Sequence, residues 1–292
     1  MAVWCFGSIN IDHFYTLEHL PAPGETLAAQ SYRVELGGKG ANQSVAAARA
    51  GAAVRHLGAV GVDGAKALFE LEAAGVECHA VQRLEGATGH AVIMVDQAGE
   101  NSIIIHAGAN REMALAPVLE ALADAEPGDM LLIQNETAHQ AELAEAAMRK
   151  GMQVIYSAAP FDVEAVRAVL PFVSLLVMNA VEAAQMQAAL GLRLDEVPVE
   201  TLVITRGAEG ASWLARGQPE IHVPAQPVHV VDTTGAGDCF TGALAAALDA
   251  SSAPEEAMRF ASAAAALQVG CVGTAGAMPR RAEILALIDE RR

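Results

Sequence analysis

The feature that most constrains the fold is an alternation between short apolar runs rich in β-branched residues and longer stretches rich in Ala, Leu and Glu. The short runs have the length of buried strands, and the longer stretches have the length of helices. Repeated βαβ units of this kind form a parallel sheet with helices on both faces. The pattern predicts strands at residues 3–7, 54–60, 130–134, 153–157, 175–178, 202–205 and 228–231, and helices at 41–50, 65–74, 113–125, 138–150, 181–189 and 239–248.

Two stretches, residues 10–36 and 88–106, break this alternation. Within the second, strand-like runs at 90–96 and 102–106 flank the turn-forming residues 97–101, which favours a β-hairpin. Strands of this kind do not fit easily inside a parallel sheet. We therefore expect them to form a small β-flap over one end of the main sheet.

Composition and charge exclude several functional classes. Of the 292 residues, 53% are hydrophobic, which provides ample material for a core. The 35 acidic and 18 basic residues give a net charge of −17, which would repel nucleic acid and anionic membranes. The uncharged segment 260–278 is interrupted by Gly and polar residues, so it favours a buried Ala-rich helix followed by a loop over a membrane span.

The cysteines and the N-terminal sequence indicate a cytoplasmic protein. Cys5, Cys78, Cys239 and Cys271 lie far apart and form no C-x-x-C pair, as expected for core residues in a reducing compartment. The first residues contain neither the basic segment nor the cleavage site of a secretory signal.

The strongest local motif is Asp232-Thr-Thr-Gly-Ala-Gly-Asp238, between a strand-like run and an Ala-rich run. Its glycines allow a tight turn at a helix N-terminus, where free N–H groups and the helix dipole favour an anion such as phosphate. Asp238 would face the same space from the first helical turn, although an Asp there can also serve only as a cap. No G-x-x-x-x-G-K-[ST] motif is present, and Phe240 stands where G-x-G-x-x-G requires Gly. A P-loop enzyme and a Rossmann dehydrogenase are therefore disfavoured.

Two further motifs suit a polar ligand. The segment 37–42, Gly-Gly-Lys-Gly-Ala-Asn, enters a helix, and Lys39 and Asn42 could bind a polyol; it could equally be an ordinary turn with a solvated lysine. The segment 7–12 ends the first strand, where ligand groups of open α/β sheets lie. Asn10 and Asp12 share one face of an extended chain, and Asp12 could accept bonds from sugar hydroxyls or simply form an Asx turn.

These three segments, in this order and at these separations, resemble the PfkB (ribokinase-like) family of carbohydrate kinases over essentially the whole chain. Together with His106-Ala-Gly-Ala-Asn110 they most resemble the family members that phosphorylate ribose. The resemblance implies one α/β domain over residues 1–292. It would be a ribokinase-like three-layer sandwich with a mainly parallel central sheet and a small β-sheet lid from residues 10–36 and 88–106.

The resemblance also implies roles for individual residues, with Asp238 as the catalytic base. The residues that would hold the sugar are Asn10, Asp12, Gly38, Lys39, Asn42, Glu136 and Asp238. Those that would lie against ATP and Mg²⁺ are Asn179, Glu182, Thr205, Gly207, Gly210, Gly235, Ala236 and Gly237. Glu182 would act on Mg²⁺ through metal-bound water, although Asn179 and Glu182 taken alone could be a capping box.

The same resemblance implies a monovalent cation, potassium in the family, near the Asp232 motif. The residues that would bind it are Asp232, Thr234, Gln268, Cys271 and Gly273, the last three through carbonyl groups. The chain departs from the family at Ala277, where a hydroxyl is often found. It also departs in the segment 191–200, which is too short for the helix that relatives often place there, and in the turn at 63–65, which is shorter than in the family.

The implied reaction is transfer of the γ-phosphoryl group of MgATP to D-ribose, which gives ADP and ribose 5-phosphate. Alternative acceptors are fructose, deoxyribose and a nucleoside such as adenosine, the last disfavoured by an aromatic content of only 4%. A non-catalytic sugar or nucleotide sensor is a further alternative, against which Asp238, Asn179 and Glu182 together argue. The resemblance also implies a homodimer joined through the β lid, and we expect no nucleic-acid or membrane partner.

Overall fold

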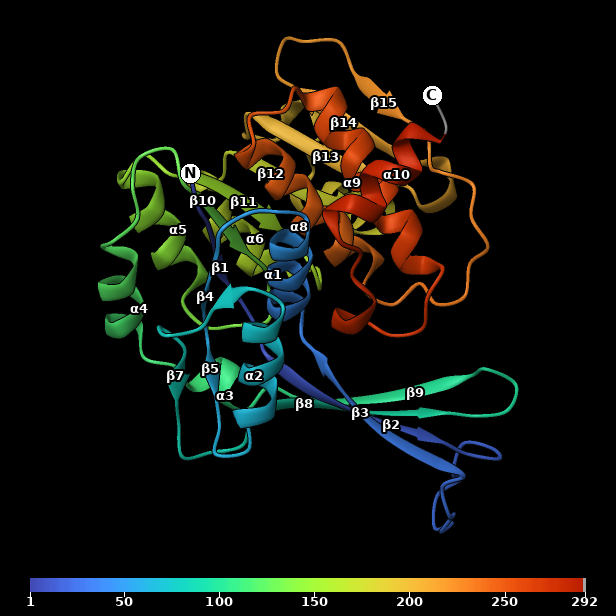
Figure 1. Ribbon diagram of the computed structural model, residues 1–292. Coiled ribbons are helices and arrows are strands. Elements are labelled where there is room, and N and C mark those ends of the chain that lie inside the picture. The colour runs from blue at the N-terminus through green and yellow to red at the C-terminus, as the bar shows by residue number, and fades with distance from the viewer. Residues whose placement is uncertain (291–292) are drawn as a thin grey trace.

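The computed structural model describes residues 1–290 and has the predicted α/β architecture, built on one large sheet (Figure 1). Its strands are β1 (Val3–Phe6), β4 (Val54–Leu57), β6 (Val76–Glu77), β10 (Met130–Ile133), β11 (Gln153–Ser157), β12 (Leu175–Asn179), β13 (Thr201–Thr205), β14 (Ala211–Ala215) and β15 (Ile221–Val223). Their order is β15-β14-β13-β12-β11-β10-β1-β4-β6. Neighbours from β6 to β13 are parallel, whereas β14 and β15 pair antiparallel at one edge.

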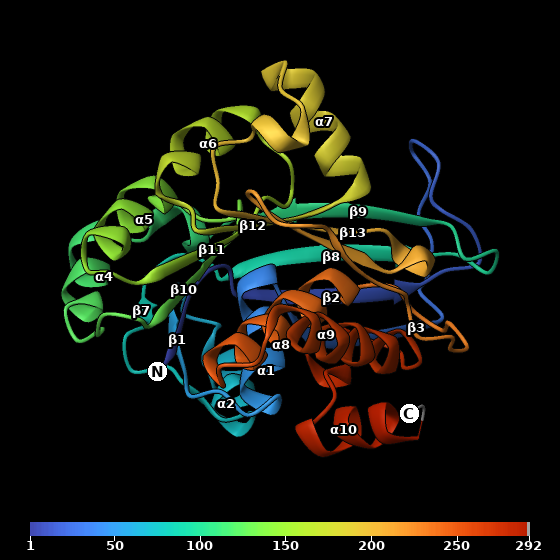
Figure 2. The same cartoon turned by 90° about the horizontal axis from the view of Figure 1, so that it is seen from above.

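Helices cover both faces of this sheet, as the view from above shows (Figure 2). One face carries α1 (Lys39–Arg49), α2 (Ala65–Ala73), α8 (Ala236–Asp249), α9 (Pro254–Val269) and α10 (Arg281–Asp289). The other carries α4 (Leu115–Leu122), α5 (Gln140–Arg149), α6 (Val163–Val169) and α7 (Ala180–Leu190). Side chains of β1 alternate between two apolar cores: Val3 and Cys5 face the α1 side, and Trp4 and Phe6 face the α5 side. The prediction of a three-layer sandwich is confirmed.

A separate four-stranded sheet projects from the main body (Figure 1). It consists of β2 (Asn10–Thr16), β3 (Ser31–Gly37), β8 (Gly89–Val95) and β9 (Asn101–His106) in the order β3-β2-β8-β9. The predicted hairpin is present as the antiparallel pair β8 and β9, and β2 pairs in parallel with β8. Asn10 and Asp12 lie on the buried face of β2, so this sheet carries polar groups toward the main body.

The prediction of a strand at 228–231 is wrong. These residues pair with no strand within residues 1–290, and Val230 and Val231 are 54% and 50% exposed. The N–H of Val231 instead donates to the carbonyl of Val269, at the end of α9. The Val residues have the strand pattern, but the backbone bonds to the end of α9 and not to the edge strand β15.

Two predicted elements differ in length. The strand expected at 54–60 divides at Gly58 into β4 and the short β5 (Ala59–Val60), which pairs with β7 (Gln82–Arg83). A Cβ at Gly58 would lie 2.8 Å from the carbonyl oxygen of Gly7, so the chain passes too closely there for a side chain. The helix expected at 113–125 is shorter, as α4, and follows the single turn α3 (Ala109–Glu112).

The segment 260–278 lies in α9 and the following loop, as predicted. No helix within residues 1–290 is long and apolar enough to cross a membrane. The segment 191–200 contains only a 3₁₀ turn at Leu194–Glu196, and all four cysteines are free.

Candidate active site

Two helices, α1 and α8, begin beside one cavity, and each follows a glycine with positive φ. Gly38 has a φ of 88° and Gly235 a φ of 81°, conformations that favour glycine over any residue with a Cβ. The first N–H groups of α1 already donate, that of Lys39 to Glu136 and that of Ala41 to the carbonyl of Ser8. The first turn of α8 has no side-chain cap, so its N–H groups and dipole favour an anionic ligand.

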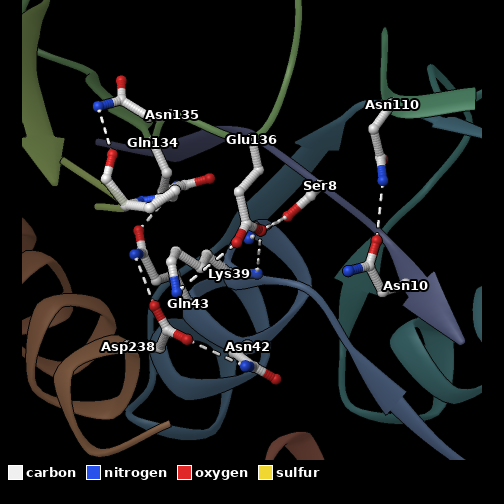
Figure 3. Close-up of polar contacts among 12 residues, drawn as sticks. Ser8, Asn10, Lys39, Asn42, Gln43, Asn110, Gln134, Asn135, Glu136 and Asp238 are labelled. Carbon is white, nitrogen blue, oxygen red and sulfur yellow. Dashed lines mark hydrogen bonds and ion pairs between the residues drawn. The ribbon is translucent and has the colours of Figure 1, made fainter. Parts of the chain in front are cut away.

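Asp238 lies in that first turn and is oriented by two amide side chains (Figure 3). Asn42 Nδ2 donates to Asp238 Oδ2 and Gln43 Nε2 donates to Asp238 Oδ1, both at 3.0 Å. Gln134 Nε2 donates to Gln43 Oε1 at 2.8 Å, which sets the direction of the Gln43 amide. Each Asp238 oxygen keeps lone pairs for a further donor, and α1 holds the carboxylate in one orientation.

Burial and neighbouring charge tune the ionisable groups at this point. Burial raises the pKa of Asp238 above its ordinary value, although the charge of Lys39 and the amides of Asn42 and Gln43 oppose the shift. Burial alone would lower the pKa of Lys39, but the carboxylates of Asp238 and Glu136 raise it. The site therefore holds a charged lysine beside a carboxylate of increased basicity.

A group of polar side chains extends from Asp238 through Lys39, Glu136 and Ser8 to Asn10 (Figure 3), and we call it the polar pocket. Glu136 accepts bonds from the Ser8 hydroxyl and the Lys39 N–H, and its Oε1 lies 3.6 Å from Lys39 Nζ. Asn10 Oδ1 accepts from Asn110 Nδ2 at 2.8 Å, so the amide nitrogen of Asn10 is the group left for a ligand.

Buried oxygen atoms without protein partners point to a hydroxyl-rich ligand in this pocket. Asp12 Oδ1 and Asn42 Oδ1 are buried and accept no bond from any residue within 1–290. Burying such acceptors is costly unless a ligand or water donates to them. Burial, with repulsion from Glu136 and Glu35, raises the pKa of Asp12 to about 7. A ligand that donates hydrogen bonds would stabilise its ionised form.

Two adjoining cavities extend from Asp238 toward the antiparallel edge of the sheet. The first, of about 200 Å³, reaches from Lys39 and Asp238 to Asn179, Glu182 and Thr205. The second, of about 510 Å³, is lined largely by apolar groups, including Val228, Phe240 and Ala265, and by the predicted residues Thr205, Gly207, Gly210, Ala236 and Gly237. Thr205, Ala236 and Gly237 line both, so an elongated ligand with a polar and an apolar end fits the pair.

Asn179 and Glu182 form a capping box at the start of α7. Asn179 Oδ1 accepts from the Glu182 N–H, and Glu182 Oε2 accepts from the Asn179 N–H. Burial raises the pKa of Glu182. Within residues 1–290 no group of three or more His, Cys, Asp and Glu side chains could hold a metal alone. A single carboxylate beside a phosphate cavity suits Mg²⁺ that arrives with phosphate oxygens and water, so these residues fit that ion.

The predicted potassium ligands lie together, but the side-chain NH₂ of Gln268 occupies the point between two of their carbonyl groups. Asp232 Oδ1 accepts from the Thr234 N–H and Asp232 Oδ2 from the Gly273 N–H. The carbonyls of Thr234 and Gly273 both accept from Gln268 Nε2. The carbonyl of Gln268 accepts from the Cys271 N–H, and the Cys271 side chain is exposed. Since Ala277 adds no hydroxyl, this set does not fit a bound potassium ion.

The structure adds site residues that the motifs did not single out. Gln43 and Gln134 orient Asp238, Ser8 bonds to Glu136, and Asn110 bonds to Asn10. Asn110 lies in a segment noted only for its resemblance to a family motif. Phe240 and its apolar neighbours line the larger cavity. The sequence did not indicate this role, because apolar residues in a helix are usually core residues.

The comparisons with known proteins agree with this geometry. Residues 2–281 match the model of the pfkB family carbohydrate kinases. Ribokinase of Bacillus subtilis is 37% identical over 292 residues, covering 97% of this chain and 98% of that protein. Ribokinase of Haemophilus influenzae is 34% identical over 300 residues, covering 97% of each. The solved structure of Arabidopsis thaliana ribokinase complexed with ribose and ATP has a TM-score of 0.87 at 31% identity, covering 99% of both chains.

The match to this family, together with relatives that are ribokinases, shows that the chain is an ATP-dependent carbohydrate kinase. The chain belongs to the PfkB family of carbohydrate kinases.

Proposed function

We propose that this kinase transfers the γ-phosphoryl group of MgATP to the 5-hydroxyl of D-ribose. The observation that carries the proposal is the position of Asp238, which is buried at the N-terminus of α8 between the hydroxyl-binding pocket and the cavity suited to a nucleotide. The ribokinases of Bacillus subtilis and Haemophilus influenzae and the Arabidopsis thaliana structure with ribose and ATP support ribose as the acceptor.

In the proposed complex the sugar lies between β2 and the start of α1. Asp12 and Asn42 accept bonds from sugar hydroxyls through their unpartnered oxygens, and Lys39 and Glu136 contact further hydroxyls. Gly38 lets the start of α1 approach the chain before β2, since a Cβ there would lie 2.8 Å from the Ser8 carbonyl oxygen and 2.9 Å from the Asn10 nitrogen, and it would contact the sugar through its backbone. The adenosine half of ATP lies in the larger apolar cavity, and its phosphates lie in the smaller one.

Asp238 acts as the general base. A sugar hydroxyl is too weak an acid to ionise in advance, so its proton passes to Asp238 as the bond from O5 to the γ-phosphorus forms. The bond from that phosphorus to the β–γ bridging oxygen breaks, and its electron pair leaves with ADP. The raised pKa of Asp238 increases its basicity.

Fixed positive groups stabilise the charge that spreads over the phosphoryl oxygens. The first turn of α8, at Gly235, Ala236 and Gly237, lines the smaller cavity, so its helix dipole favours the phosphates there, and Lys39 adds a full charge. Glu182 and Asn179 would hold hydrated Mg²⁺, which neutralises phosphate charge when bound.

The small sheet would act as a lid that excludes water from the sugar. Its edge strand β9 exposes Ile103, Ile104 and Ile105, which are 51%, 61% and 66% accessible. An exposed apolar edge strand favours pairing with a second copy, so we propose a homodimer joined through the lid. We further propose that the enzyme acts in the cytoplasm, where its free cysteines stay reduced.

The test is ADP formation from MgATP with a panel of acceptors: D-ribose, 2-deoxyribose, fructose, adenosine and inosine. The proposal predicts the highest kcat/KM for D-ribose, with ribose 5-phosphate as the product. A higher value for deoxyribose or a nucleoside would retain the mechanism and overturn the substrate. The Salmonella typhi deoxyribokinase, 31% identical over 299 residues, makes deoxyribose the most informative competitor. No turnover with any acceptor, while ATP still binds, would support the sensor alternative.

A further inference from the structure

The carbonyl groups of Thr234 and Gly273 converge on one point beside the N-terminus of α8. Two carbonyl oxygens that face one point repel each other unless a positive group lies between them. In this chain the group is the side-chain NH₂ of Gln268, whose Nε2 lies 2.7 Å from the Thr234 oxygen and 3.1 Å from the Gly273 oxygen. An amide NH₂ carries two donors, so it can serve both carbonyls at once.

The orientation of this amide is fixed by its surroundings. Gln268 is fully buried, and turning the amide over would place Oε1 against two carbonyl oxygens at these distances. Oε1 itself accepts no bond from any residue within the described range of 1–290, so the two donated bonds alone hold the side chain.

The carboxylate of Asp232, in the same loop, also accepts hydrogen bonds from backbone groups of that loop. Asp232 accepts the N–H groups of Thr234 and Gly273, which close the two halves of the loop on each other. Burial alone would raise the pKa of Asp232, but these bonds lower it below its ordinary value, so it stays ionised. Neither Asp232 nor the two carbonyls needs an added cation to complete its bonding.

We propose that the Gln268 amide takes the place of the monovalent cation implied by family resemblance, so that this kinase works without one. Gln268 then acts as a positioning residue. It holds the turn at Thr234 so that Gly235 to Gly237 face the phosphates and the Asp238 carboxylate faces the sugar hydroxyl. The inference rests on the proposed kinase function but not on ribose in particular.

The experiment compares activity and melting temperature in tetramethylammonium chloride and in potassium chloride at equal ionic strength. For the wild-type protein we expect turnover and melting temperature to be unchanged by potassium. Gln268→Ala leaves a cavity between the carbonyls. We expect it to lose at least about tenfold in turnover without potassium and to regain most of it with potassium or rubidium. Its melting temperature should rise on adding potassium, a readout that needs neither acceptor nor ATP.

Two variants separate this role from ordinary packing. Gln268→Met fills the space without a donor, so its lost turnover should not be restored by potassium. Val272→Ala, at an exposed position in the same loop, should behave as the wild type. A wild-type enzyme that requires potassium would overturn the proposal. So would a Gln268→Ala enzyme that is equally active without the ion, or one whose lost turnover and melting temperature the ion leaves unchanged. If no acceptor is phosphorylated at all, the melting temperatures still decide the question.

Discussion

At the scale of single residues, Asp12 has the most unusual charge environment in the sugar pocket. Burial, with the charges of Glu136 and Glu35, raises its pKa to about 7 in the sugar-free protein. Sugar hydroxyls donate to the ionised form, so binding below that pH requires the carboxyl to lose its proton. We expect the KM for ribose to rise about tenfold between about pH 8 and about pH 6. Steady-state kinetics over that range test this prediction.

Asp12→Asn is the matched variant, since it keeps the shape and removes the titration. Its KM for ribose should be high and independent of pH. The raised pKa of Asp12 also makes the stability of the sugar-free protein depend on pH, in the direction opposite to sugar binding. A carboxyl whose folded pKa exceeds its unfolded value stabilises the fold at low pH, and this contribution is lost as the pH rises through about 7. If the KM of Asp12→Asn for ribose keeps the pH dependence of the wild type, another group titrates.

The local sequence indicated the glycine-rich turns of the site and the charged residues within them, because glycine clusters mark turns with unusual backbone conformations. The motifs predicted glycine-rich turns that enter helices; Gly38 and Gly235 form these turns with a positive φ, and Asp238 lies in the first helical turn. Gln43 and Gln134 could not be assigned from sequence, since their contacts join residues 91 and 195 positions apart. A single glutamine, whether in a helix as Gln43 or just after a strand as Gln134, has no local signature that distinguishes such a role from a surface position.

At the scale of elements, the close packing of α1 on α8 sets the distance between the proposed sugar pocket and Asp238, the proposed base. Gly242 makes this approach possible: a Cβ there would lie 2.5 Å from the carbonyl oxygen of Gln43 and 2.7 Å from the Ala46 Cβ. Gly242→Ala must push the helices apart, so it should lower the free energy of unfolding by about 1–3 kcal/mol and also reduce kcat. Chemical denaturation and steady-state kinetics measure both effects.

Gly237→Ala, in the same helix, is the control for stability. A Cβ there meets no heavy atom within 4 Å, so the free energy of unfolding should be unchanged or slightly increased. Equal losses of stability in both variants would contradict the packing explanation.

At the scale of the whole molecule, the alternation of apolar runs was enough to predict the parallel sheet, the two helical layers and the separate small sheet. Each of these follows from local periodicity and from the need to bury one face of every element. The edge of the main sheet was predicted less well, because strand pairing there depends on which backbone groups remain free. The residues 228–231 have a strand pattern, yet they pair with no strand within residues 1–290, and Val228 and Val230 line the larger cavity.

The exposed edge of the lid gives a prediction for assembly. Ile103 and Ile105 lie on the same face of β9, opposite Ile93 and Ala91 of β8. Changing both to lysine should convert a dimer of about twice 30.2 kDa into a monomer, since burying two charges opposes the interface. Sedimentation equilibrium gives the mass directly. A wild-type monomer, or a mutant that still dimerises, would contradict assembly through this edge.

In the proposed reaction Asp238 removes the proton from the sugar hydroxyl, and turnover of Asp238→Asn with MgATP and D-ribose tests this role. Asn42 can turn its amide so that Oδ1 accepts from the new side chain, and this should preserve the fold and ATP binding. Removing a general base typically costs about 100-fold or more, so we predict a fall in kcat of at least about 100-fold with nucleotide affinity unchanged. Near-normal turnover in this variant would contradict the assignment of Asp238 as the base.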